Sequence, residues 1–196
     1  MRTKSGNKLQ TKDYIVAGAF AALYAVLLFG TVTATGFMPV VYIFAPLILS
    51  IVLGTVYMLY IAKIPKRWSI MILAVLVGLL TSMGGMWFAF IWAVILGVIA
   101  DTIANTGERT KKKYVLSYMV FACTNMGPFW ALIIAKDKFL GVCTSYYGQD
   151  YADAIDRLTP PWIVAAFLAM ALVGGLIGGL IGIKLLKKHF EKAGVV

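Results

Sequence analysis

Residues 14–30 read YIVAGAFAALYAVLLFG, an uninterrupted apolar run that is long enough to enter a bilayer as a helix. One face of this helix carries only small side chains, namely Ala17, Gly18, Ala21, Ala22 and Ala25. Small residues let two membrane helices approach each other closely. The stripe therefore predicts a packing face, either for the chain's own helices or for a separate membrane protein.

The composition points the same way for the whole chain. The sequence is 61% hydrophobic and 13% charged, whereas a soluble domain is about half apolar and about a quarter charged. We therefore expect one integral membrane domain over residues 1–196. The net charge of +10 does not indicate nucleic-acid binding, because the basic residues fall in short segments between the apolar runs, where they act as topology signals.

The apolar runs predict an all-α membrane protein with a bundle of six transmembrane helices. We place these helices at residues 14–30, 40–62, 67–83, 85–105, 114–135 and 160–186. Pro46 predicts a kink in the second helix, and Pro128 predicts a loosened turn near Thr124 in the fifth. Residues 136–159 form one long loop, in which 151–158 have the pattern of a short amphipathic helix.

The uncharged stretch 68–100 is too long for one span and short for two, and Gly84-Gly85 is its natural break. Basic residues flank it, at 63–67 before and 109–113 after. Basic loops lie on the cytoplasmic side of a membrane. Both clusters belong on that side only if the chain crosses an even number of times between them, so we divide the stretch into two helices.

The distribution of Lys and Arg predicts the orientation of the bundle. Fifteen of them fall in the N-terminal segment, in 63–67, in 109–113 and in the C-terminal tail. Lys136, Lys138 and Arg157 fall on the other side. The sequence therefore predicts a multi-pass protein of the cell membrane with both termini cytoplasmic and the 136–159 loop external.

The spans carry almost no groups that catalyse reactions or bind metals. His189 is the one histidine and lies in the C-terminal tail, and Cys123 and Cys143 lie at different predicted depths. We therefore expect no enzymatic activity, no cofactor, no metal site and no disulfide. The chain has no P-loop either, so ATP-driven transport would need another subunit to hydrolyse ATP.

Asp101 is the clearest ionisable residue within a predicted span. A buried acid in a membrane is a functional candidate by default. Its place near the cytoplasmic end of the helix favours a structural role instead, in which it pairs with Arg109 or Lys113. No deeper acid or base provides a relay for proton-coupled transport.

Aromatic residues gather on the external side, around Asn125 in the fifth helix. A belt of rings at the membrane interface is one explanation, and Asn125 alone also fits a hydrogen bond between helices. The clustering favours a pocket that binds a ring from outside. The residues we infer to bind substrate are Phe37, Trp87, Asn125, Trp130, Tyr146, Tyr147 and Trp162.

Several short motifs add a family resemblance. They are the Lys12-Asp13 pair before the small-residue stripe, Met86-Trp87, GVIAD at 97–101, YGQDY at 147–151, and the tail KKHFEKAGVV at 187–196. Through them nearly the whole chain resembles the substrate-binding S components of energy-coupling factor (ECF) transporters, and in particular the MptD-type or Trep_Strep group.

The resemblance implies a subunit that captures a vitamin-like or other small nutrient from outside and delivers it by reorienting in the bilayer. It implies three partners, a transmembrane T component and two cytoplasmic ATPases. Docking of the T component would fall on Ala17, Ala21 and Ala25, with Gly18 and Ala22 on the adjoining row. Cobalt-type members carry a histidine where this chain has Arg2, which argues against a metal substrate. The alternatives are a membrane scaffold or assembly protein without a transport role, and a facilitator that works without ATPases.

Overall fold

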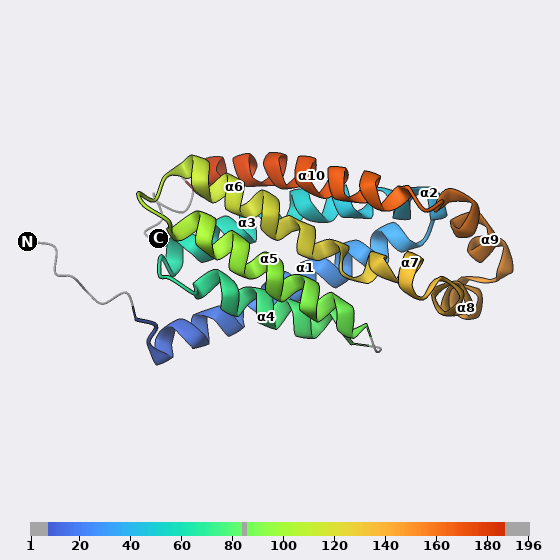
Figure 1. The fold of residues 1–196 in the computed structure, drawn as a ribbon, viewed down its shortest axis with the longest axis horizontal. Coiled ribbons are helices and arrows are strands. Elements are labelled where there is room, and N and C mark those ends of the chain that lie inside the picture. The colour runs from blue at the N-terminus through green and yellow to red at the C-terminus, as the bar shows by residue number, and fades with distance from the viewer. Residues whose placement is uncertain (1–7, 84–85, 187–196) are drawn as a thin grey trace, which may run out of the picture.

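The computed structural model describes residues 8–83 and 86–186, which form a bundle of helices (Figure 1). Helix accounts for 85% of the structure, and the described residues contain no strand. The all-α prediction is therefore confirmed. The break at Gly84-Gly85, the basic residues Arg2 and Lys4, and the tail from Lys187, which includes His189, lie outside the described residues.

The helices follow one another with short connections. In chain order they are α1 (Thr11–Gly36), α2 (Pro39–Ile43), α3 (Ala45–Lys63), α4 (Ser69–Thr81), α5 (Trp87–Asn105), α6 (Lys111–Ala122), the 3-10 turns η1 (Cys123–Met126) and η2 (Pro128–Trp130), α7 (Ala131–Ile134), α8 (Lys136–Tyr147), α9 (Gln149–Leu158) and α10 (Ile163–Leu185).

Four helices are long and apolar enough to cross a membrane: α1, α3, α5 and α10. The bent pair Lys111–Met126 and Pro128–Ile134 makes a fifth if it is counted as one span. The fourth helix of the chain, α4, has 13 residues and so spans about 20 Å, less than the hydrocarbon core of about 30 Å. The prediction of six spans is therefore supported for four or five of them.

Prolines divide two of the predicted helices. The second breaks at Phe44, and Pro46 lies in the first turn of α3, where a missing N–H costs no hydrogen bond. The fifth tightens into the 3-10 turn η1 just before Pro128 and bends by 46°. The regular α-helix ends near Thr124, as Pro128 predicted, but the turn there is tighter than an α-helix and not looser.

The expected loop at 136–159 is wrong, because these residues form the helices α8 and α9. The predicted amphipathic helix at 151–158 lies within α9. The two helices cover one end of the bundle (Figure 1), and α9 packs against α2. The hydroxyl of Tyr151 donates to the carbonyl of Gly36 at 2.7 Å, and the Tyr147 and Tyr151 rings stack at 4.5 Å. These contacts fasten α9 to the end of α1.

Glycines bring α10 and α3 into backbone contact. Gly174, Gly178 and Gly182 are buried on the side of α10 that faces α3. A Cβ added to Gly178 would lie 2.4 Å from the carbonyl oxygen of Ser50. Close approach of this kind is how helices gain packing energy in a bilayer, where no hydrophobic effect drives them together.

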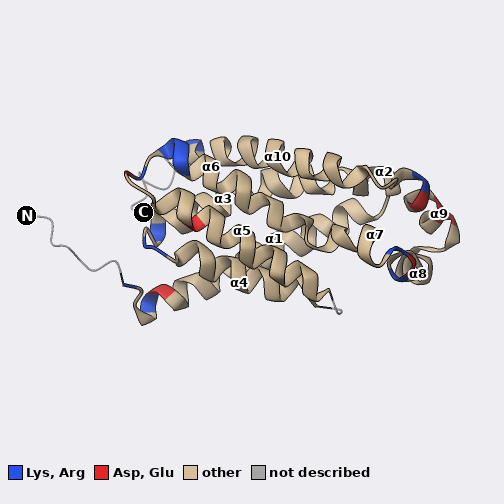
Figure 2. Cartoon of the chain, viewed as in Figure 1, with Lys and Arg blue, Asp and Glu red and all other residues tan. Residues whose placement is uncertain are grey.

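The charged residues mark the two ends of the bundle (Figure 2). We call the end with Lys63–Arg67 and Arg109–Lys113 the basic end, and the end covered by α8 and α9 the cap end. From the basic end α4 runs toward the cap end, and α5 returns (Figure 1). Both basic clusters therefore lie at the same end, as their charges predicted. That this end faces the cytoplasm stays a prediction.

Side-chain contacts hold the turns at the basic end together. Lys66 Nζ lies 2.6 Å from Asp13 Oδ2, which ties the start of α1 to the turn between α3 and α4. The Asp101 carboxylate accepts the backbone N–H groups of Trp68 at 3.1 Å and Ile70 at 3.2 Å. These bonds hold the turn in which Trp68 takes a φ of +70°. The structural role expected for Asp101 is thus observed, with different partners.

Candidate functional site

A cavity of about 220 Å³ lies toward the cap end of the bundle. It is bounded by the second half of α1, the α2–α3 break, the end of α4 and the bend between η1 and η2. Its lining comprises Leu28, Phe29, Val32, Tyr42, Leu49, Leu80, Thr81, Met83, Met86, Asn125, Pro128 and Phe129. The lining is apolar and aromatic with few polar groups, which is typical of small-molecule sites.

The proline breaks help to form this cavity. Tyr42 lies just before the α2–α3 break, and Pro128 and Phe129 form the turn after η1. The Tyr42 and Phe129 rings contact each other with centroids 5.2 Å apart. Irregular backbone at membrane depth is tolerated only where it is buried in protein or lines a cavity, and η1 and η2 meet that condition.

Asn125 is the notable polar group of the lining. Its side chain is 2% exposed, and its Oδ1 accepts a hydrogen bond from the Tyr24 hydroxyl at 3.0 Å. Its amide nitrogen Nδ2 has no hydrogen-bond partner among the described residues. An unpaired buried donor costs free energy, so an acceptor that a ligand brings to this buried N–H group would offset that cost.

Several other buried hydroxyls in the bundle are paired. The Tyr57 hydroxyl and Ser117 Oγ lie 2.6 Å apart, and Ser117 also donates to the carbonyl of Ala100. Tyr60 donates to the carbonyl of Ser69 at 2.6 Å. Within residues 8–83 and 86–186 the unpaired buried side-chain atoms are Thr124 Oγ1, Asn125 Nδ2 and Trp130 Nε1. All three come from the seven-residue stretch 124–130, at or next to the cavity.

A second hollow of about 150 Å³ adjoins the cavity at Met86. It lies between the start of α5, α7 and α8, and its other lining residues are Phe88, Ala131, Ala135, Lys138, Phe139 and Val142. Methionine is unbranched and flexible, so Met86 is suited to move between the two hollows.

Of the residues predicted to bind substrate, Asn125 lines the cavity. Trp130 packs edge-on against Trp92 with ring centroids 5.2 Å apart. Tyr147 is half exposed and stacks on Tyr151 in the cap. The remaining four, Phe37, Trp87, Tyr146 and Trp162, are each about two-thirds exposed or more and are not among the residues that line the cavity in the described structure.

Sequence reasoning missed most of the cavity lining. The sequence could have indicated Met83 and Met86 as lining residues, because they flank the predicted Gly84-Gly85 break. Leu28, Leu49 and Leu80 carry none, because an aliphatic residue that lines a cavity cannot be distinguished in sequence from one that packs in a core.

The small-residue stripe of α1 separates into two rows. Ala17 and Ala21 are 1% and 5% exposed and belong to the core of this chain, so the packing interpretation applies to them. Gly18 and Ala22 are exposed, and a Cβ added to Gly18 meets no described atom within 4 Å. Ala25 is intermediate.

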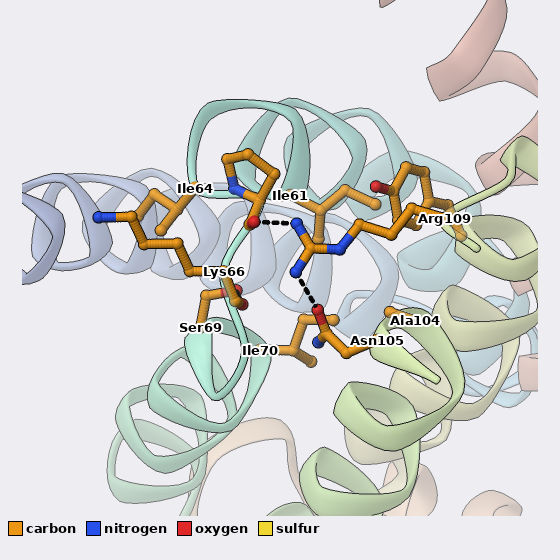
Figure 3. Close-up of a pocket in the computed structure, with 10 residues that line it drawn as sticks. Ile61, Ile64, Lys66, Ser69, Ile70, Ala104, Asn105 and Arg109 are labelled. Atoms are coloured by element: carbon orange, nitrogen blue, oxygen red, sulfur yellow. Dashed lines mark hydrogen bonds between the residues drawn. The ribbon is translucent and has the colours of Figure 1, made fainter. Parts of the chain in front are cut away.

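A hollow at the basic end is too small for a solute (Figure 3). Its volume is about 10 Å³, which is roughly the space of one water molecule. Arg109 reaches across it, donating to the carbonyl of Pro65 and to Asn105 Oδ1 at 2.7 Å. Lys113 donates to the carbonyl of Thr106. The expected pairing of Asp101 with Arg109 or Lys113 is therefore wrong, and this region is a packing junction.

The described residues contain no group of three or more His, Cys, Asp or Glu side chains that could hold a metal ion. Cys123 and Cys143 are both free and buried. The fold and the cavity together define a multi-pass helical membrane protein with a cavity toward one end of its bundle.

Residues 11–192 match the family of hypothetical bacterial integral membrane proteins named Trep_Strep, and the chain belongs to that family. No curated protein and no solved structure matches the chain.

Proposed function

We propose that this protein is the substrate-binding S component of an ECF-type importer, which captures a vitamin-like or other small nutrient. The observation that carries the proposal is the 220 Å³ cavity beside the unpaired amide of Asn125. It lies in the half of the bundle farther from the basic end, and clusters of basic residues favour the cytoplasmic side. A solute would therefore enter from outside the cell.

The cap formed by α8 and α9 would be the outer cover of the site. It is joined to α1 through the Tyr151–Gly36 hydrogen bond and to α2 by packing. Binding energy at the cavity and movement of the cap would be linked through these contacts. With no P-loop in its sequence, the chain relies on two partner ATPases to drive its reorientation in the bilayer.

Docking of the T component would fall on the exposed row of α1, at Gly18 and Ala22. Small residues at i and i+4 let a second helix come close, whereas Ala17 and Ala21 already serve the chain's own core. The double variant Gly18→Trp/Ala22→Trp should block co-purification with the T component. Ala165→Trp/Ala169→Trp is the matched control, since both residues are exposed on α10 at the same spacing.

The test of function is to purify the full chain, extract the small molecules bound to it and identify them by mass spectrometry. We expect one solute to be enriched over the Asn125→Leu variant, and its uptake into cells to need the partner ATPases. Uptake without ATPases would indicate a facilitator. A chain that carries no solute and binds no T component would indicate a scaffold or assembly protein.

A further inference from the structure

We infer that the Asn125 cavity takes an uncharged, mainly apolar ligand about one substituted ring in size, which presents a hydrogen-bond acceptor to Asn125 Nδ2. The inference rests on the proposed function, in that it takes this cavity to be the binding site. It adds the chemical class of the ligand, which follows from the volume, the charge and the hydrogen bonds of the lining.

The volume limits the ligand to about one ring with its substituents. An apolar cavity of about 150 Å³ holds a benzene molecule. The cavity here measures about 220 Å³, which leaves room for a small group beyond the ring. The Tyr42 and Phe129 rings form part of the wall, and aromatic rings favour contact with another ring through their faces and edges.

The charge of the lining excludes an ionised ligand. The described lining contains no Asp, Glu, Lys, Arg or His. A charge that is buried without a partner loses its hydration and gains nothing in return. Lys138 is exposed and lines the neighbouring hollow, which adjoins this cavity at Met86.

The hydrogen bonds of the lining specify an acceptor. Thr81 Oγ1 already donates within α4, to the carbonyls of Val77 and Gly78. The Tyr24 hydroxyl donates to Asn125 Oδ1, which leaves the two N–H donors of Nδ2. A carbonyl oxygen or a ring nitrogen on the ligand would satisfy one of them. A ligand without such an atom would leave the donor unpaired and would bind more weakly.

The experiment compares three fluorinated probes of one shape by ligand-observed ¹⁹F NMR. The probes are 4-fluoroacetophenone, its alkene analogue 4-fluoro-α-methylstyrene, and 4-fluorobenzoate. The full chain is placed in lipid nanodiscs, and empty nanodiscs correct for partition into lipid. We expect the ketone to bind at least about tenfold more tightly than the alkene or the carboxylate, as the loss of one buried hydrogen bond implies.

The variant Tyr24→Phe/Asn125→Leu removes both hydrogen-bonding partners and keeps similar shapes. In this variant the ketone and the alkene should bind within about twofold of each other. If it does not fold, Tyr24→Phe/Asn125→Val is used instead. It removes the same hydrogen-bonding groups with a smaller side chain and should also lose the preference for the ketone. Ser50→Ala is the control that should keep it, because Ser50 is not among the residues that line the cavity and its hydroxyl already donates to the carbonyl of Pro46.

Equal binding of the alkene and the ketone would overturn the inference, as would tightest binding of the carboxylate or no binding of any probe. Different results would reject the importer proposal, namely that no solute co-purifies with the chain and that uptake does not depend on ATPases. A charged nutrient found by mass spectrometry would therefore reject the ligand class while the proposed function stands.

Discussion

The contact between α3 and α10 allows a sharp test of how this bundle is held together. At Gly178 an added Cβ would lie 2.4 Å from the carbonyl oxygen of Ser50 and 2.7 Å from that of Ile51. Both obstacles are backbone atoms, which cannot rotate away as a side chain can. To raise the first contact to 3.0 Å, the two helices must separate by about 0.6 Å along that direction. Neighbouring pairs such as Gly54 and Gly178 would then lose their contact.

Overpacking of this kind costs about 1–3 kcal/mol, and the backbone clash places Gly178→Ala at about 3 kcal/mol. For a protein of this size that corresponds to a fall in Tm of roughly 6–12 °C. The assay is thermal unfolding of the purified protein in detergent, followed by loss of the monodisperse peak.

Gly179→Ala is the matched control for Gly178→Ala, because it changes the next residue of the same helix. The nearest atom to its new Cβ is the flexible end of Met58, at 3.3 Å. We expect this variant to stay within about 1 kcal/mol of the parent, since Ala also favours the helix over Gly. If Gly178→Ala unfolds at the same temperature as Gly179→Ala, the close α3–α10 contact is not what stabilises the bundle.

Three further variants test single contacts by the same unfolding assay. Lys66→Met should lower the free energy of unfolding by about 1–2 kcal/mol, because it removes the cation from the mostly buried Asp13 carboxylate, which keeps only its bond from the Gln10 N–H. Adding Asp13→Asn should cost less than the sum of the two, and full additivity would contradict the ion pair. Asp101→Ala should lower the free energy of unfolding by about 2 kcal/mol, and Asp101→Asn should lower it less, because Asn keeps one acceptor for the α4 N-terminus. Equal losses in the two variants would contradict this role of Asp101. Without ligand, Tyr24→Phe/Asn125→Leu should raise the free energy of unfolding by about 1 kcal/mol, because it removes the unpaired Nδ2 donor. A clear fall in that free energy would show that the Tyr24–Asn125 hydrogen bond stabilises the empty protein.

The sequence predicted those parts of the fold that depend on strong local signals. Long apolar runs located α1, α3, α5 and α10, and Pro128 located the turn at η1 because proline removes a backbone donor. The basic clusters predicted that the chain leaves one end of the bundle and returns between them, and α4 and α5 do so.

Of the two cap helices, α8 was missed because its local signal is weak. The stretch 136–147 mixes charged, aromatic and small residues and has no clear helical period, so its helix depends on packing against the bundle. The length of α4 was overestimated for a different reason. Residues 81–83 are uncharged and end in the apolar Met83, so composition does not mark where the helix ends before Gly84.

The candidate site was predicted where one residue type stands out from its surroundings. Asn125 is a polar residue in an apolar span, and its place in the cavity wall agrees with that signal. The sequence places Trp87 and Trp162 at the same depth in the membrane as a pocket residue. Depth alone does not determine whether a ring faces the bundle or the lipid. Both rings are about two-thirds exposed, as in a belt at the membrane interface.

The unpaired polar atoms and the irregular backbone occur in the same stretch of chain, and this coincidence bears on whether the cavity is a site or a packing defect. A defect would be expected to have an apolar wall and regular helices around it. Here the 3-10 turns interrupt the helix at 123–130, and the same residues supply the unpaired Asn125 Nδ2 and Trp130 Nε1. The Trp92 indole N–H donates to the Cys123 carbonyl of η1 at 2.8 Å, whereas Asn125 Nδ2 and Trp130 Nε1 have no partner among the described residues and lower the stability of the empty protein. Irregular backbone and unpaired polar atoms are expected to occur together at a binding site. A ligand there can form the hydrogen bonds that the protein alone does not make.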